Sequence, residues 1–340
     1  MSSTESIVHA TPESHRRREG PYFDDLAIGQ RAKSPGLTLT TGLAATHQAI
    51  LGDRVPLALD AHLAGRVTGA RGQIANPALV WDVAIGQSTH FSQRAKANLF
   101  YRGLALRRLP EIGDTLYTET EVIALRENKR REDRHPTGMM ALRIKTVDQE
   151  NRVVLDFSRC AMIPMSAAHI TTNHQDDLSA ISSGLDRQVL RDLTADWRLS
   201  LLPTTTPVSV RDRWTVKYGD VVTSAPELAR LTLNLASVHH DYRAAGSQRL
   251  VYGGHTIGLA SAQLSKTLPG LAAIVGWQSC DHLAPVYEND TVFSTIEVED
   301  VEPLGEVGRL VDLRSVVHKV QPDGNAPVDV LDWRIVGVMT

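Results

Sequence analysis

The sequence predicts an α+β protein in which one small fold occurs twice. Two stretches recur at one constant offset: Gly113–Val122 matches Asn289–Val298, and Val154–Phe157 matches Val330–Trp333. In each copy an apolar, proline-free segment with helical periodicity precedes several runs rich in Thr, Val and Ile. One helix followed by antiparallel strands is typical of a helix wrapped by a sheet. We therefore expect two such units in one chain.

The elements follow the same order in both copies. We expect a helix over Leu79–Gln87 in the first copy and over Thr256–Leu268 in the second, because their apolar residues follow a helical period. A third match, with small gaps, pairs Leu79–Trp81 with Leu250–Tyr252. Glu288–Asp290 marks a turn between strands. The expected strands are Thr115–Val122, Met140–Val147, Arg152–Ile163, Ile274–Cys280, Thr291–Val298, Gly308–Val317 and Val328–Val338.

The repeat divides the chain into four parts. Residues 21–165 form the first unit and residues 211–340 the second. The pattern is lost over residues 166–210, which we interpret as a long connector with one short helix near Leu185–Leu193. Residues 1–20 are polar and lack the apolar stretch of a secretory signal, so we expect a disordered tail.

The composition excludes several classes of partner. Apolar residues make up 42% and charged residues 22% of the 340 residues, which suits a globular protein with a sizeable core. The formal charge of −3 does not favour nucleic acid or an anionic membrane. No apolar run is long enough to span a membrane. The two cysteines, Cys160 and Cys280, lie far apart, so we expect no disulfide and a cytoplasmic location.

One stretch of the second copy gathers groups that could act on water beside a thioester carbonyl. Asn234 and His239 stand five residues apart, and Gly253-Gly254 opens an apolar helix. An imidazole is a suitable general base near neutral pH, an amide can hold a water, and free backbone N–H groups stabilise an oxyanion. The stretch therefore favours addition or removal of water. The alternative is that Gly253-Gly254 only forms a tight turn and that the stretch has no catalytic role.

Three segments resemble the MaoC-like acyl dehydratases, in particular the double-hotdog members of mycobacteria and related actinobacteria. These segments are Pro21–Gln30, Leu250–Gly258 and Asp281–Val286. The resemblance covers nearly the whole chain apart from much of the connector. It implies a hotdog fold, a central helix wrapped by an antiparallel sheet, present twice. It also implies (R)-specific hydration of an enoyl thioester, or the reverse dehydration. Coenzyme A is expected as the substrate carrier, with acyl carrier protein as the alternative, and no cofactor is expected.

The family's hydratase pattern, Gly-Asp-x-Asn-Pro-aliphatic-His-x-Asp, occurs twice and is incomplete both times. The first copy keeps Asp53 but has Ala58 where the catalytic histidine would stand. The second copy keeps His239 but has Asn234 in place of the aspartate. Asn234 follows Asp53 by the same number of residues as His239 follows Ala58, so the two copies of the pattern align without a gap. We therefore expect a working site in the second copy and a structural remnant at Asp53.

The resemblance implies a role for each residue of this site. His239 is expected as general base and acid, Asn234 as the group that orients water, and N–H groups near Gly253 and Gly254 as the oxyanion hole, with Gly254 counted among the catalytic residues. Asp241 is expected to orient His239 or to cap a helix. The expected substrate-binding residues are Tyr252, Gly253, His255, Asp241 and Arg249.

Two other functions remain open on the sequence alone. A non-catalytic acyl-CoA-binding protein would explain why neither copy has the complete pair. A hotdog thioesterase is disfavoured, because the segment His255–Lys266 contains no Asp or Glu. Cys280–His282 together with His239 has no known metal-ligand spacing, so no metal is expected.

The acyl group and the oligomeric state are less constrained. Because the first copy lacks the histidine, we expect its residues near Trp81 and Ile85 to line a wide pocket for a fatty, branched or steroid-derived chain. Two hotdogs in one chain form the dimer-like unit internally, which allows a monomer or a further homodimer.

Overall fold

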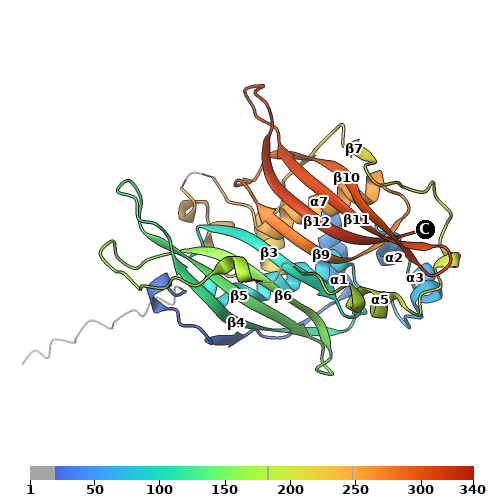
Figure 1. Ribbon diagram of the computed structural model, residues 1–340, viewed down its shortest axis with the longest axis horizontal. Helices are drawn as coiled ribbons and strands as arrows, with labels where there is room; N and C mark the ends of the chain where they lie inside the picture. Colours follow the sequence, from blue (N-terminus) through green and yellow to red (C-terminus); the bar gives the residue numbers. More distant parts are fainter. Residues whose placement is uncertain (1–19, 182–183, 247) are drawn as a thin grey trace, which may run out of the picture.

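The computed structural model describes residues 20–181, 184–246 and 248–340. Nearly all of the expected disordered tail, residues 1–20, lies outside this described part. Within it, twelve strands form one antiparallel sheet that curves around the helices (Figure 1). None of the described helices is long and apolar enough to cross a membrane.

The first half of the chain builds one side of the sheet and four helices. Its strands are β1 (Arg31–Lys33), β2 (Leu37–Thr38), β3 (Ala97–Leu106), β4 (Thr115–Glu127), β5 (Thr137–Val147) and β6 (Val153–Pro164). Its helices are α1 (Thr41–Leu51), α2 (Pro56–Leu59), α3 (Ala61–Thr68) and α4 (Pro77–Gln87), followed by the 3-10 turn η2 (Ser88–Ser92). The connector contributes α5 (Arg187–Thr194), close to where the sequence predicts a short helix.

The second half repeats this arrangement. Its strands are β7 (Arg213–Thr215), β8 (Asp220–Val221), β9 (Leu271–His282), β10 (Thr291–Leu304), β11 (Gly308–Lys319) and β12 (Val328–Met339). Its helices are α6 (Ala225–Leu231) and α7 (Gly253–Thr267), with the 3-10 turns η5 (Ser237–His239) and η6 (Tyr242–Ala244) between them. Each half is therefore one central helix, α4 or α7, wrapped by its own strands, which confirms the double hotdog.

The structure corrects one of the three sequence matches. Helices α4 and α7 begin at Pro77 and Gly253, which differ by the same offset as the matching strands, so the repeat extends to the helices. Tyr252 caps the start of α7 and its counterpart is Asn76, which caps α4. The proposed match of Tyr252 with Trp81 was wrong, because Trp81 lies inside α4, one turn beyond the cap.

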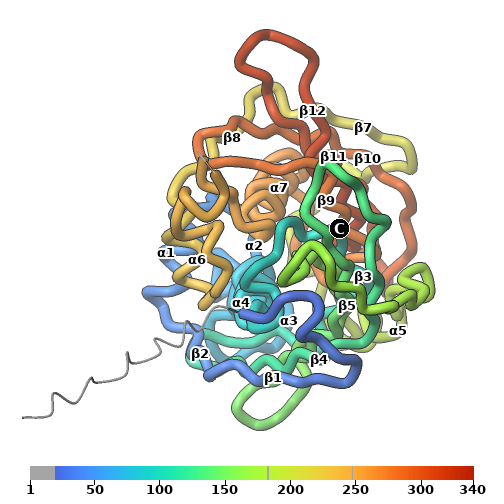
Figure 2. Tube along the Cα trace, turned by 90° about the vertical axis from the view of Figure 1, so that its left-hand side faces the viewer, coloured from blue at the N-terminus to red at the C-terminus, as the bar shows by residue number. Residues whose placement is uncertain are grey.

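The two halves are joined where β3 pairs with β9. Phe100 stands opposite Asp281 and Ala105 opposite Gly276, and the sheet runs on from β6 through β3 and β9 to β12. The sequence analysis missed β3, because Arg102-Gly103 interrupts its apolar run. The pairing brings α4 and α7 side by side on the inner face of the sheet (Figure 2).

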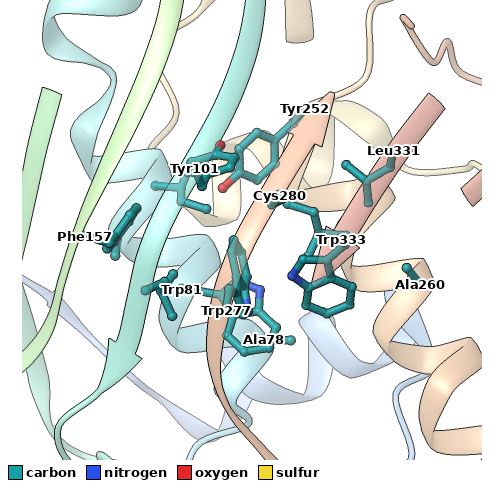
Figure 3. Packing of buried hydrophobic residues seen from close by; sticks show 14 of the residues in the cluster. Ala78, Trp81, Tyr101, Phe157, Tyr252, Ala260, Trp277, Cys280, Leu331 and Trp333 are labelled. Atoms are coloured by element: carbon teal, nitrogen blue, oxygen red, sulfur yellow. The ribbon is translucent and has the colours of Figure 1, made fainter. Parts of the chain in front are cut away.

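Three tryptophans fill the space between the halves. Trp81 of α4 packs edge-to-face on Trp277 of β9 and Trp333 of β12, with ring centroids 4.9 and 6.1 Å apart (Figure 3). All three rings are buried, and so is Ile85. The expectation of a wide pocket near Trp81 and Ile85 was therefore wrong: bulky aromatic side chains from the second half occupy that space.

Each half also sends a loop onto the central helix of the other. The Asp53 carboxylate accepts hydrogen bonds from Ser261 and Ser265 of α7, at 2.8 and 2.9 Å. From the other half, the Leu235 N–H donates to the Thr89 hydroxyl just beyond α4, at 2.9 Å, as the Arg54 N–H does to the Ser265 hydroxyl of α7. Asp53 is almost fully buried and satisfied, which supports a structural role for this remnant.

A glycine permits the closest of these contacts. A Cβ added to Gly86 in α4 would lie 2.1 Å from the backbone oxygen of Thr232, in the loop that leads to Asn234. A backbone atom cannot rotate away as a side chain can, so this contact sets the distance between α4 and the loop.

We predict that Gly86→Ala lowers the free energy of unfolding by about 1–3 kcal/mol, because the methyl group overpacks this contact. Gly42→Ala is the matched control: it lies in α1, and its added Cβ would meet nothing closer than 3.9 Å. That substitution should be neutral or stabilise by up to about 1 kcal/mol. Urea denaturation measures both, and equal effects of the two substitutions would contradict the prediction.

Candidate active site

A cavity of about 650 Å³ lies between the two halves. Both halves line it, through η2, β3 and β6 on one side and through the η5 loop, the start of α7 and the end of β9 on the other. Its polar lining includes Thr89, Ser92, Asn98, Tyr101, Arg159, Asn234, His239, Tyr252, Thr256 and His282. The two candidates from the sequence, His239 and Asn234, thus face one cavity.

The histidine is oriented as a base. His239 is half-buried at the end of η5, and its Nδ1 lies 2.9 Å from the carbonyl oxygen of Leu250. A carbonyl oxygen only accepts, so Nδ1 carries the proton and Nε2 keeps its lone pair. Burial lowers the pKa of the ring to about 4, and the charge of Arg159 acts in the same direction. The ring is therefore neutral at pH 7 and able to take a proton.

The amide is oriented as a donor. Leu233 has a left-handed backbone (φ 59°), as does its counterpart Gly52 (φ 72°), so both copies make the same turn. The side-chain oxygen of Asn234 accepts the Ala236 N–H at 2.9 Å, and its backbone oxygen accepts from His240 Nε2 at 2.7 Å. The Asn234 Nδ2 group has no partner among the described residues and remains available to a water in the cavity.

The start of α7 borders the same cavity. Gly253 and Gly254 are its first two residues, whose N–H groups have no acceptor within the helix. Gly253 lines the cavity, and a Cβ there would lie 2.9 Å from the His282 ring. Gly254 lies deeper, where a Cβ would come within 2.2 Å of the Asp82 carboxylate. The hydroxyl of Tyr252 donates to the Asp82 carbonyl at 2.9 Å and anchors this segment on α4.

Three of the expected substrate-binding residues lie elsewhere. His255 is fully buried away from the cavity, because its position in α7 turns it into the core, and burial lowers its pKa to about 4. Asp241 caps η6 and pairs with Arg243 instead of orienting His239. Arg249 forms an ion pair with Glu288. The structure does not bring these three to the cavity.

Sequence reasoning missed the contribution of the first half. Arg159, Asn98 and Tyr101 come from β6 and β3, and none belongs to a motif. The available signal was an arginine at position 159, inside the apolar strand run Val153–Pro164. His282 was considered only as a metal ligand. No cluster of three or more metal-ligating side chains occurs in the described ranges.

Comparisons with known proteins identify relatives that share most of the chain. RV0216 of Mycobacterium tuberculosis, a conserved hypothetical protein with a double hotdog fold, is 46% identical, and the match covers 95% of this chain and 100% of that one with a TM-score of 0.87. A β-methylmalyl-CoA dehydratase of Chloroflexus aurantiacus is 26% identical over 84% of both chains. A mesaconyl-CoA hydratase of Cereibacter sphaeroides is 27% identical over 85% of this chain and 86% of its own.

No protein-family model matches the sequence. The fold, however, is shared with solved MaoC-type dehydratases, and the relative at 46% identity spans almost the whole chain. The chain therefore belongs to the MaoC-like acyl dehydratase family, in its double-hotdog form.

Proposed function

We propose that the protein catalyses the reversible hydration of an enoyl thioester carried by coenzyme A. The observation that carries the proposal is the convergence of the neutral His239 and the Asn234 amide on one cavity beside the start of α7. Curated relatives that share most of the chain are named as a dehydratase and a hydratase of CoA thioesters, which supports the same class of reaction here.

The chemistry follows from the three groups. A water accepts a hydrogen bond from Asn234 Nδ2 and gives a proton to His239 Nε2 as its oxygen adds to C3 of the enoyl group. Negative charge develops on the thioester oxygen, where the N–H groups of Gly253 and Gly254 and the dipole of α7 stabilise it. The protonated His239 then returns the proton to C2. Dehydration is the same sequence in reverse.

Asn234 distinguishes this site from the complete motif. A carboxylate in its place could share the proton, whereas the amide only positions the water, so His239 alone carries the acid–base work. One imidazole that serves both steps delivers the hydroxyl and the proton to the same face of the double bond. The (R) configuration of the product follows from the family resemblance and forms part of the proposal.

The central-helix carboxylate that thioesterases of this fold use is not available in the cavity. Helix α7 contains no Asp or Glu. Asp82 of α4 is fully buried, is bonded to His47 at 2.9 Å, and does not line the cavity. The geometry therefore favours hydration over thioester hydrolysis.

We expect His239→Gln to lower kcat for hydration of crotonyl-CoA by about 10²–10⁴-fold, because it removes the base that is proposed to take the proton of the water. Asn234→Ala should cost less, on the order of 10-fold, because the water loses one hydrogen bond. His62→Gln, exposed in α3, is the control. The reaction is measured by the loss of absorbance of the conjugated double bond. Wild-type protein that binds enoyl-CoAs of several chain lengths but hydrates none would instead be a binding protein.

The pH profile provides an independent test of the base. Hydration requires the neutral ring, and burial lowers the pKa of His239 to about 4. We therefore expect kcat/KM to be constant from about pH 6 to 8 and to fall only below about pH 5, as the ring takes up a proton. Circular dichroism over the same range separates this loss from unfolding. A midpoint at 6.5 or higher in the folded protein would contradict the assignment.

A further inference from the structure

Asn98 brings a hydrogen-bond donor from the first half to the end of the cavity beside Gly253. It lies on β3, one of the two strands that join the halves, and lines the cavity. A Cβ added to Gly253 would lie 3.8 Å from the Asn98 Nδ2 atom and 2.9 Å from the His282 ring. Two donors that share one oxygen at ordinary hydrogen-bond length lie no more than about 6 Å apart. The Asn98 amide is therefore placed to share an acceptor with the Gly253 N–H.

Arg159 fixes which end of the Asn98 amide faces this space. Arg159 lies on β6, with only 6% of its surface exposed. Its Nε donates to the Asn98 side-chain oxygen at 2.7 Å, and one of its terminal nitrogens donates to the Ser88 hydroxyl at 3.2 Å. A guanidinium only donates hydrogen bonds and stays charged at every physiological pH. The amide oxygen of this Asn98–Arg159 pair is therefore taken up, and the amide nitrogen is the atom near Gly253.

The Asn98 nitrogen lacks an acceptor. It is buried and has no hydrogen-bond partner in the described part of the chain, although the Tyr101 hydroxyl is a near neighbour. A buried donor that stays unpaired costs free energy. The described residues that line the cavity include no Asp or Glu to accept from it. An oxygen atom of a bound molecule would fill this role.

We propose that Asn98 is a third donor of the oxyanion hole, and that its Nδ2 group donates a hydrogen bond to the thioester oxygen beside the Gly253 N–H. The inference rests on the proposed hydration and adds a catalytic residue from the first half to it. Arg159 is then a positioning residue, which holds the amide in the donating orientation and polarises its N–H bonds through the amide oxygen. A donor that is held in place beforehand stabilises developing charge without reorganisation.

The internal repeat supports this assignment. The equivalents of the Asn98–Arg159 pair in the second half are Ile274 and Ile335, which hold the same places in the strand register, and both are buried. The equivalent of Gly253 is Pro77, which has no N–H group to donate. The donors therefore occur together with the retained histidine, and the positions equivalent to them hold residues that cannot donate.

Kinetic measurements test the role of Asn98 in the reaction. We expect Asn98→Ala to lower kcat for crotonyl-CoA by about 10²–10³-fold, which is typical for the loss of one oxyanion-hole donor. KM should change by less than about threefold, because the hydrogen bond strengthens mainly in the transition state. Asn98→Asp should be at least as slow, since it keeps the size of the side chain but offers the thioester oxygen no donor. Asn128→Ala is the control, because Asn128 follows β4 and does not line the cavity.

Infrared spectroscopy tests the same hydrogen bond without the reaction. Butyryl-CoA labelled with ¹³C at the thioester carbonyl is saturated and cannot be hydrated. A hydrogen bond to the carbonyl oxygen lowers its stretching frequency. We expect a lower frequency for bound than for free butyryl-CoA in the wild type and in Asn128→Ala, and a return toward the free value in Asn98→Ala and Asn98→Asp.

A double-mutant cycle tests the positioning role of Arg159. Arg159→Met keeps an unbranched stem but removes the bond to the Asn98 oxygen. We expect it to lower kcat and to reduce the carbonyl shift in the wild-type background, and to add little to Asn98→Ala, because it acts through Asn98. Equal effects of Arg159→Met in the two backgrounds would overturn the positioning role.

The inference and the proposed function fail separately. If crotonyl-CoA is hydrated and Asn98→Ala leaves the carbonyl frequency unchanged, the inference is overturned, even where kcat falls. If no enoyl-CoA is hydrated but the carbonyl frequency of bound butyryl-CoA depends on Asn98, the proposed function fails and the donor assignment holds. If butyryl-CoA does not bind and no enoyl-CoA is hydrated, both are overturned. Thermal melts identify any variant that fails to fold, and Asn98→Asp, which keeps the bond to Arg159, replaces Asn98→Ala in that case.

Discussion

The antiparallel pairing of β3 with β9 is the constraint on which the rest of the molecule depends. It merges two sheets into one, so the two central helices must share one concave face. Because α4 and α7 are in contact there, the loop of each half that carries the motif, around Asp53 or Asn234, packs on the central helix of the other half. The cavity then has one wall from each half. Neither half alone contains a complete site.

This shared architecture explains how the two copies could diverge. On the proposed function, a chain with two copies of the motif needs the base in only one of them. In the other, Ala58 replaces the histidine, and the Asp53 carboxylate holds the two serines of α7 and the Val55 N–H. The carboxylate therefore packs between the halves and does not line the cavity. In the second copy the amide at Asn234 makes a single turn contact and leaves its nitrogen free. On the proposed function, one copy of the motif therefore has a packing role and the other carries the chemistry.

Much of this could be predicted from the sequence, because repeats and motifs are local signals. The repeat and the periodicity within it located the two central helices and the long strands other than β3. The equal spacing of the two motif copies aligned their loops, and the structure shows the same left-handed turn in both, at Gly52 and Leu233. The cavity could not be predicted in the same way. Arg159 and Asn98 reach it from strands of the other half, and no sequence separation signals such a contact. His255 lies in the core because each step along a helix turns the side chain by about 100°, and it is Gly253 and Thr256 of α7 that line the cavity.

The position of the histidine in the cavity also sets its strength as a base. Burial is the largest cause of the lowered pKa of His239, and the charge of Arg159 adds a smaller effect in the same direction, so the free site holds a neutral but weak base. A bound substrate would not remove that burial, so the ring would stay a weak base during the reaction. On the proposed function, the barrier must therefore be lowered mainly by the position of the water between Asn234 and His239 and by the N–H donors at the start of α7.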